Sequence, residues 1–154
     1  NIIFGKNFNA GNNLRLEAVK ETAKIILSNN ITIGNNVHIG AASEVKIGEH
    51  SLIGSNIIII DHDHGDYSDY SDFADLPSTP PKKRKIKSKP ITIGSNVWVG
   101  DNVAILKGSI VPNGTIIGAN SRVSGALDAD SIYIGNPLKK IKQFDYNLKK
   151  WIRI

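Results

Sequence analysis

Aliphatic residues recur every six positions along most of the chain. The clearest series consists of six β-branched residues: Ile93, Val99, Ile105, Val111, Ile117 and Val123. Two shorter series have the same spacing and are separated by a slip of two residues: Leu27, Ile33 and Ile39, then Ile47, Ile53 and Ile59. A weaker copy opens the chain at Phe4, Ala10 and Leu16. A period of six fits neither an amphipathic helix nor a strand that alternates every second residue.

A period of six fits a triangular coil in which each hexapeptide forms one short face and three faces form a turn. The aliphatic residue points inward and stacks on its counterpart in the next turn. Asn, Asp and Gly then occupy the corners, where positive φ is often needed. Pairs of this kind are Asn12-Asn13, Asn35-Asn36, Ser95-Asn96 and Asp101-Asn102. A β-sandwich would instead show period two with turn signals about every 8–12 residues, so the sequence predicts an all-β parallel coil of about five turns.

Two segments interrupt the repeat, and the pattern changes near the C-terminus. Residues 17–26 break the phase early, and residues 61–90 form a long excursion rich in Asp, Tyr, Ser, Pro and Lys. Long loops inside compact repeats are usually functional or disordered. After Gly135-Asn136-Pro137 a basic segment follows, which reads as a terminal helix or an extended tail. We therefore expect one domain, with the coil at 1–136 and a basic helix or tail at 137–154 that caps it.

Composition and charge narrow the possible chemistry. The chain of 154 residues has no cysteine, which excludes disulfides, a thiol nucleophile and a thiolate metal site. No apolar run is long enough to cross a bilayer and no signal-peptide pattern opens the chain, so we expect a cytoplasmic protein. The formal charge is +5. Six acids in residues 61–75 cancel six bases in residues 82–89, which leaves the excess in the tail. A basic tail is either a solvated face or a surface for an anionic partner, such as nucleic acid, a membrane or a phosphorylated cofactor.

Several motifs resemble one known family. Residues 90–100 read Pro-Ile-Thr-Ile-Gly-Ser-Asn-Val-Trp-Val-Gly, and two further matches begin at Ile117 and Gly135. Together they resemble the hexapeptide-repeat acetyltransferases, which include maltose, galactoside and xenobiotic acetyltransferases and the O-acetyltransferases of capsule and lipopolysaccharide clusters. The segment Asp-His-Asp-His-Gly at residues 61–65 is similar to the catalytic-histidine motif of the polysaccharide-modifying branch.

The resemblance implies a fold, an assembly and a reaction. The fold would be a left-handed parallel β-helix, and the functional unit a homotrimer with active sites between neighbouring coils. Acetyl-CoA would lie along the groove between coils, and a histidine would deprotonate a hydroxyl of a carbohydrate acceptor. The expected activity is therefore acetyl transfer from acetyl-CoA to a sugar hydroxyl of a surface polysaccharide or its precursor.

Two histidines compete for the role of general base. Histidine suits this role because its ordinary pKa is about 6.5. The position just before the excursion favours His62 over His64, and the two rings would share a face if the segment is extended. Either Asp61 or Asp63 would hold the imidazole tautomer, as a carboxylate does in catalytic triads. His38 and His50 lie within the coil, and we interpret both as surface histidines.

Further site residues follow from the resemblance and from their positions. Trp98 should face outward, and it would border both acetyl-CoA and the acceptor. Glu17 and Asp63 are expected to help bind the acceptor. The positions of the family's CoA contacts correspond to Asp101, Gly118, Ala119, Ser124, Lys139 and Lys142. Related enzymes often carry Thr-Lys where this chain has Ser124-Gly125, which removes one cation from the phosphate contacts.

Three other functions compete with sugar O-acetylation. An amino-sugar N-acetyltransferase or a serine acetyltransferase would share the coil, but the motif at 61–65 points to polysaccharide. A metal-dependent hydratase resembling the β-helix carbonic anhydrases would need three histidines with a close pair four or five apart, whereas His62 and His64 are two apart. A purely structural coil would not need an excursion that carries histidines. We expect no metal, because the histidine spacing does not fit and the thioester is already activated. We expect no nucleic-acid partner, because the acids of the excursion can pair with its lysines.

Overall fold

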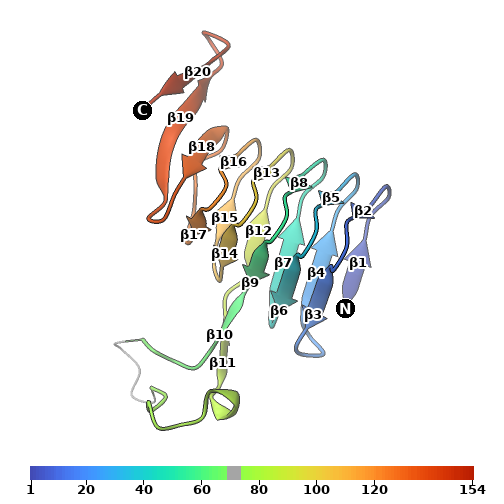
Figure 1. Cartoon of the computed structure of the whole chain (residues 1–154), viewed down its shortest axis with the longest axis vertical. Helices are drawn as coiled ribbons and strands as arrows, with labels where there is room; N and C mark the ends of the chain where they lie inside the picture. Colours follow the sequence, from blue (N-terminus) through green and yellow to red (C-terminus); the bar gives the residue numbers. More distant parts are fainter. Residues whose placement is uncertain (69–73) are drawn as a thin grey trace.

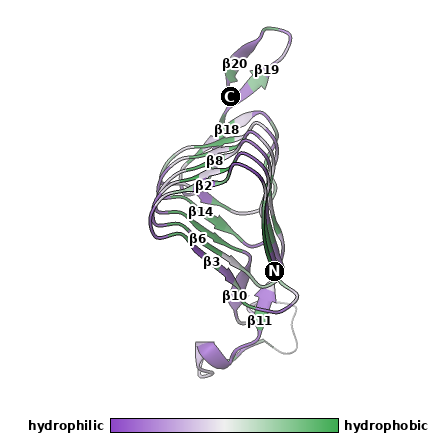
Figure 2. Ribbon diagram, turned by 90° about the vertical axis from the view of Figure 1, so that its right-hand side faces the viewer, coloured by the Kyte–Doolittle hydropathy of each residue, from purple (hydrophilic) through white to green (hydrophobic). Residues whose placement is uncertain are grey.

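The computed structural model describes residues 1–68 and 74–154 as a coil of three parallel β-sheets (Figure 1). The first sheet contains β1 (Ile2–Phe4), β4 (Lys24–Leu27), β7 (Glu44–Ile47), β12 (Ile91–Ile93) and β15 (Ile110–Val111). The second begins with β2 (Asn9–Ala10), β5 (Thr32–Ile33), β8 (Leu52–Ile53), β13 (Trp98–Val99), β16 (Ile116–Ile117) and β18 (Ser131–Ile134). The third contains β3 (Arg15–Ala18), β6 (His38–Ala41), β9 (Ile58–Ile60), β14 (Ala104–Leu106) and β17 (Arg122–Val123). The chain visits the sheets in rotation, so each turn adds one strand to every wall (Figure 2).

The aliphatic residues of the repeat fill the interior, as predicted. All members of the three long series from Leu27 to Val123 are no more than 2% exposed. They stack in columns, because Ile53 pairs with Ile33 of the preceding turn and with Val99 of the next. Fully burying one such side chain stabilises a fold by about 1.5–3 kcal/mol. Phe4 keeps the same phase, pairing with Leu27, but it lies at the open end of the coil and is 50% exposed.

Asparagines at the corners adopt the left-handed conformation. Asn13, Asn36, Asn96 and Asn102, the second members of the four predicted corner pairs, have φ between 55° and 59°. Their amides also form a ladder along the coil: Asn13 Nδ2 donates to Asn36 Oδ1 at 2.9 Å, and Asn36 Nδ2 donates to Asn56 Oδ1 at 3.1 Å. Asparagine tolerates positive φ better than most residues, so the predicted corners are confirmed with a physical reason.

Replacing Asn36 with Ala is expected to lower the free energy of unfolding by about 1–2 kcal/mol, mainly because its Cβ makes the left-handed conformation costly. Asn36→Gly loses the same ladder contacts but adopts positive φ freely, so it should cost less. Denaturant unfolding of both variants measures the difference. Equal losses would contradict this explanation and assign the stability to the amide ladder.

Insertions account for the irregularities in the first half of the repeat, while the last turn is shortened to the 16 residues that separate Ile117 from its partner Tyr133. An uninterrupted turn takes 18 residues, the separation between Ser95 and Asn113 at one corner. The turn from Asn36 to Asn56 takes 20, because two extra residues lie between β6 and β7. The largest insertion is the excursion, which leaves the coil after β9 and returns at β12. It begins with β10 (His62–His64) and ends with β11 (Ile86–Ser88), and it carries a 3-10 segment at Pro81–Lys83.

The C-terminal segment is extended, so the helical alternative is wrong. β19 (Lys139–Asp145) runs antiparallel to β18, and β20 (Lys150–Arg153) runs antiparallel to β19, which lengthens the second sheet into a hairpin. Residues 1–68 and 74–154 contain no α-helix. In this described part of the chain, no helix is long and apolar enough to span a membrane.

Candidate active site

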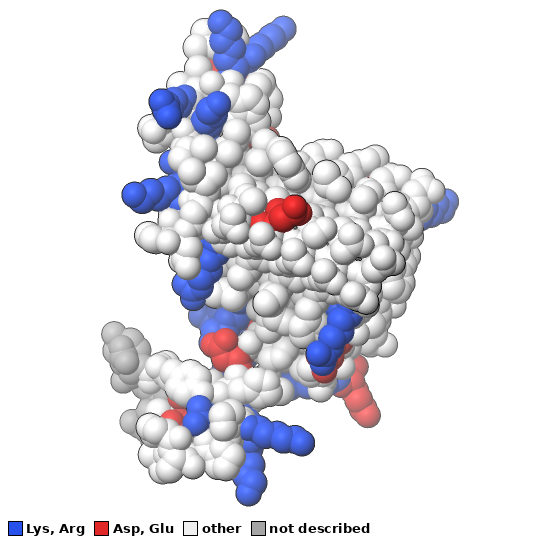
Figure 3. All heavy atoms as spheres, in the orientation of Figure 1, with Lys and Arg blue, Asp and Glu red and all other residues white. Residues whose placement is uncertain are grey.

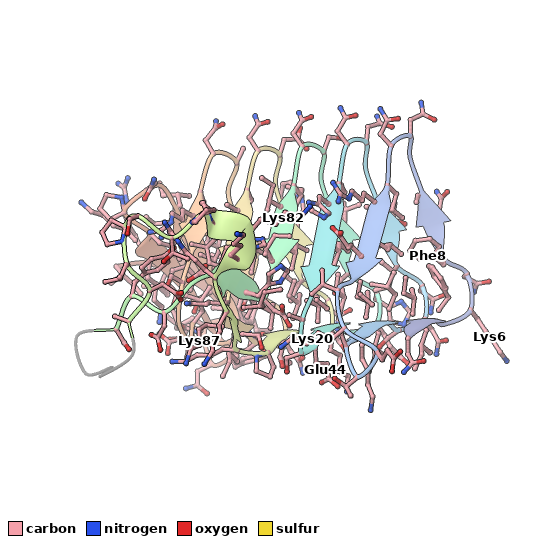
Figure 4. The ribbon with its side chains drawn as sticks, turned by 90° about the horizontal axis from the view of Figure 1, so that it is seen from below. Lys6, Phe8, Lys20, Glu44, Lys82 and Lys87 are labelled. Carbon is pink, nitrogen blue, oxygen red and sulfur yellow. The ribbon has the colours of Figure 1, made fainter. Side chains whose placement is uncertain are left out.

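The histidine motif lies where the excursion leaves the third sheet. β10 and β11 form a two-stranded antiparallel ribbon in which His62 faces Ser88 and His64 faces Ile86. Residues two apart on a strand share a face, so the two histidine rings lie on the same side, 6.0 Å apart between centroids. The expectation for an extended segment is therefore confirmed. Lys82 and Lys87 belong to the same excursion, which lies beside the stacked turns in Figure 4.

Asp61 is fully buried and holds His62. Its Oδ1 accepts hydrogen bonds from the Ala42 amide at 2.7 Å and from His62 Nδ1 at 2.9 Å, while its Oδ2 accepts the Ser43 amide at 2.7 Å. Because Nδ1 donates to Asp61, Nε2 of a neutral ring carries no proton and can accept one. The His62 side chain is 9% exposed, which fixes its orientation.

The slip of two residues in the repeat builds this arrangement. The extra residues after β6 turn the chain so that the amides of Ala42 and Ser43 both point at the Asp61 carboxyl. A buried carboxylate needs such donors, since an unpaired buried charge is costly. The interruption between Ile39 and Ile47 is thus part of the site.

His62 opens onto a cavity of about 370 Å³ on the outer face of the third sheet. Its lining residues are Arg15, Glu17, Val19, His38, Ile60, His62, His64 and Ile86. Glu17 joins two of them: its Oε2 lies 2.8 Å from the Arg15 guanidinium and 3.2 Å from His38 Nε2. The wall opposite the histidine ribbon therefore carries both a cation and a carboxylate.

Gly40 lies beneath His38 and His62 and leaves room for Ile60. A Cβ at Gly40 would lie 2.8 Å from Ile60 Cδ1, 3.5 Å from His62 Cε1 and 3.6 Å from His38 Nε2. His38 is therefore a cavity residue, and its interpretation as an ordinary surface histidine was incomplete. The pairing of adjacent strands could have predicted this position, because Arg15 lies opposite His38. His50 fits the surface interpretation: it is exposed at a corner with φ of 58°.

Asp63 lies on the opposite face of the ribbon. It forms an ion pair with Lys107, and a second cavity of about 420 Å³ opens beside it. Lys87 and Asp66, 2.8 Å apart, line this second cavity too. Asp61, rather than Asp63, is thus the carboxyl beside the imidazole of His62.

The remaining predicted site residues lie on other parts of the coil. Trp98 is 52% exposed on the second sheet, between Leu52 and Ile116, and it does not line the cavity of His62. Asp101, Gly118 and Ala119 stack at the corner that follows the second sheet, where the Asn120 amide donates to the Asp101 carbonyl at 2.9 Å.

Ser124 and the two lysines complete the predicted coenzyme set. Ser124 follows β17, while Lys139 and Lys142 lie on β19 opposite Ile134 and Ile132. A single chain therefore brings His62, His64 and Glu17 to one cavity, with Asp61 buried beside His62, and places the predicted CoA residues elsewhere.

No group of three or more His, Asp or Glu side chains in residues 1–68 and 74–154 is arranged to hold a metal ion. Asp69 and Asp72 of the acidic run lie outside the described residues.

Comparisons with known proteins agree with this description. No family model matches the chain. The Escherichia coli (strain K12) protein WbbJ, provisionally named a lipopolysaccharide biosynthesis O-acetyl transferase, is 39% identical over 150 residues, 97% of this chain and 76% of WbbJ. A maltose O-acetyltransferase from Clostridium difficile 630 aligns with a TM-score of 0.74 at 22% identity, over 92% of this chain and 68% of that one. A hexapeptide-repeat acetyltransferase from Vibrio cholerae, solved with acetyl coenzyme A, aligns with a TM-score of 0.72 at 23% identity, over 93% and 71%.

The fold defines the class, a left-handed parallel β-helix of hexapeptide repeats. The 39% sequence identity to WbbJ over 97% of this chain identifies the family. The chain belongs to the hexapeptide-repeat acetyltransferases, the family that its motifs predicted. By this membership the chain is an acetyltransferase.

Proposed function

We propose that this chain transfers the acetyl group of acetyl-CoA to a sugar hydroxyl of a surface polysaccharide or its precursor, with His62 as general base. The observation that carries the proposal is the buried Asp61–His62 pair at the edge of a cavity with polar walls. The likeness to WbbJ supports the choice of oxygen as acceptor and of a glycan as substrate. We predict that the enzyme works in the cytoplasm, where acetyl-CoA is made and used.

The chemistry needs little beyond this pair. His62 Nε2 takes the proton of the acceptor hydroxyl as the oxygen bonds to the thioester carbonyl carbon. The C–S bond then breaks, and the proton passes from His62 to the leaving CoA thiolate. Asp61 keeps the ring in the tautomer that accepts at Nε2 and stabilises the imidazolium that forms. The thioester is already activated, so the remaining requirements are positioning and backbone donors for the oxyanion.

The cavity wall opposite the ribbon suits a polyhydroxylated acceptor. Glu17 accepts hydrogen bonds and Arg15 donates them, and both are partly exposed to the cavity. His64 lies beside His62 on the same face, where it would orient the base or bind the sugar. We assign acceptor binding to Glu17 and His64, with Asp63 contributing from the other face of the ribbon.

We propose that the site is completed in a homotrimer. Trp98 exposes half of a large aromatic side chain on a wall that does not reach the cavity of His62 in the same chain. Packing of one coil against its neighbour would cover this side chain and bring it to the neighbour's histidine. Sedimentation velocity at micromolar concentration should therefore show a trimer, and a stable monomer would contradict both the assembly and the shared site.

Affinity for acetyl-CoA is expected to depend on Lys139 and Lys142. Changing both to Ala should raise the KM for acetyl-CoA more than it lowers kcat, as expected for binding energy that is equal in the ground and transition states. The effect should shrink in high salt, because exposed charges are screened. Steady-state kinetics at two ionic strengths measures this, and an unchanged KM would place the phosphates elsewhere, for example near Asp101, Ala119 or Ser124.

The direct test of the function is acetyl-CoA turnover against a panel of neutral, acidic and amino-sugar glycans, followed by mass spectrometry of the product. An ester on a hydroxyl supports the proposal. Acetylation confined to amino groups would show that the chain is an N-acetyltransferase, and free serine as the preferred acceptor would remove the carbohydrate assignment.

A further inference from the structure

The C-terminal hairpin of β19 and β20 projects beyond the last turn of the coil (Figure 1). Residues 139–154 carry six cations and one acid: Lys139, Lys140, Lys142, Lys149, Lys150 and Arg153 against Asp145. Figure 3 shows basic side chains gathered around this end of the molecule. Among the described residues, Lys149, Lys150 and Arg153 form no ion pair, so their charge is available to a partner.

The same hairpin exposes large apolar side chains. Leu148 at its tip is 60% exposed, Trp151 38%, and Ile154 69%. Trp151 lies opposite Phe144 on β19, with ring centroids 5.4 Å apart. Exposed Leu, Trp and Ile beside lysines are unusual on an element that contributes no side chain to the buried core, and such patches commonly mark interaction sites.

The hairpin is fixed to the coil at its root, by Lys140, and at the first residue of its turn, Tyr146. Lys140 Nζ lies 2.9 Å from Asp128 Oδ2, and this hydrogen bond together with its charge lowers the pKa of the Asp128 carboxyl. Tyr146 Oη donates to Asp130 Oδ2 at 2.8 Å, which raises the pKa of Tyr146. The polar contacts that hold the hairpin thus lie on its coil side, and Leu148, Lys149 and Lys150 at the tip remain outside them.

We propose that this hairpin docks tip first onto a membrane surface rich in anionic lipids. Leu148 would enter the headgroup region with Trp151 beside it, since Trp favours the boundary between headgroups and acyl chains. Lys149, Lys150 and Arg153 would attract the anionic headgroups. The inference concerns a surface outside the proposed active site and does not depend on the reaction catalysed there.

The observations favour a lipid surface over other partners. A second copy of the chain presents an equally basic hairpin, and like charges repel when they face each other. Single-stranded nucleic acid binds to open aromatic faces. Here Phe144 and Trp151 pack edge to face at 73°, and the exposed Leu148 and Ile154 have no part in base stacking.

The test measures co-sedimentation of the full chain with two kinds of vesicle: phosphatidylcholine alone, and equal parts phosphatidylcholine and phosphatidylglycerol. We expect binding to the anionic vesicles only, weakened by salt. Lys149→Asn with Lys150→Gln should lower the partition coefficient about 25-fold, roughly five-fold per charge. Asn at position 149 tolerates its φ of 52°. Leu148→Asn should lower it about tenfold through lost apolar contact.

The matched control removes two exposed lysines of the excursion, Lys82→Gln with Lys83→Gln, and should bind vesicles normally. All variants should keep their acetyl-CoA turnover, which separates this proposal from the catalytic one. Failure to bind anionic vesicles would overturn the proposal. Equal loss in the control pair would overturn it as well, because net charge alone would then explain binding. The same holds if the tip variants lose affinity for a single-stranded polynucleotide while vesicle binding is unchanged.

Discussion

Replacing His62 with Ala is expected to lower kcat by about 10²–10⁴-fold, the usual cost of losing a general base. The reason is geometric. His62 Nδ1 is committed to the buried Asp61, which leaves Nε2 to take a proton, and the chain has no cysteine to serve as an alternative nucleophile or base. Binding of acetyl-CoA should survive, since the predicted CoA residues lie outside this cavity. Steady-state kinetics and equilibrium binding of CoA measure the two effects separately.

His64→Ala is the internal control for this experiment. His64 shares the cavity but is exposed, and no carboxylate in the described residues holds its ring. Its loss should therefore act more weakly, and chiefly on the KM for the acceptor. If the His64 variant is inactive and the His62 variant is active, the two roles are exchanged but the mechanism remains. If both variants stay active, or if a chelator abolishes turnover, base catalysis by this pair is wrong.

The repeat made the coil predictable because one physical rule governs every turn. A narrow interior accepts one aliphatic side chain per hexapeptide, and a tight corner favours Asn or Gly, so the periods of Ile, Val and Asn specify the walls and the corners. The rule ends where the repeat ends. In residues 137–154 the basic and aromatic composition suits either a helix or a strand. The segment is extended because β19 pairs with the open edge of β18.

The site was predictable in part, from a sequence motif and from the alternation of side chains along a strand. The motif at 61–65 marked the histidines, and the i to i+2 rule placed them on one face. Choosing Asp61 over Asp63 required knowing which carboxyl lies inside the corner, and that depends on the amides of Ala42 and Ser43, some 20 residues earlier in sequence. His38 was missed because its neighbours Arg15 and Glu17 come from the previous turn, and an irregular insertion between β3 and β4 separates them from it in the sequence.

Asp61→Asn is expected to impair both catalysis and folding, by separate routes. The amide keeps the shape of the carboxyl but has one acceptor oxygen, whereas the site presents three donors: the two amides and His62 Nδ1. One donor is left facing an NH₂ group, which should cost about 1–3 kcal/mol of folding free energy. If the imidazole adopts the other tautomer to escape this clash, Nε2 carries the proton and cannot act as the base. Turnover should then fall by about 10²–10⁴-fold, as for loss of base catalysis.

The two routes are separable by measuring kcat well below the unfolding transition of the variant. His62→Ala serves as the comparison, because it removes the base without leaving a donor opposite an amide NH₂. We expect Asp61→Asn to be as slow as His62→Ala and less stable than it, and the double variant to be no slower than either alone, since both changes disable one unit. An Asp61→Asn enzyme that keeps most of its turnover would show that the buried carboxyl serves only the corner at Ala42 and Ser43. A double variant slower than both single variants by the product of their losses would show that the two residues act independently.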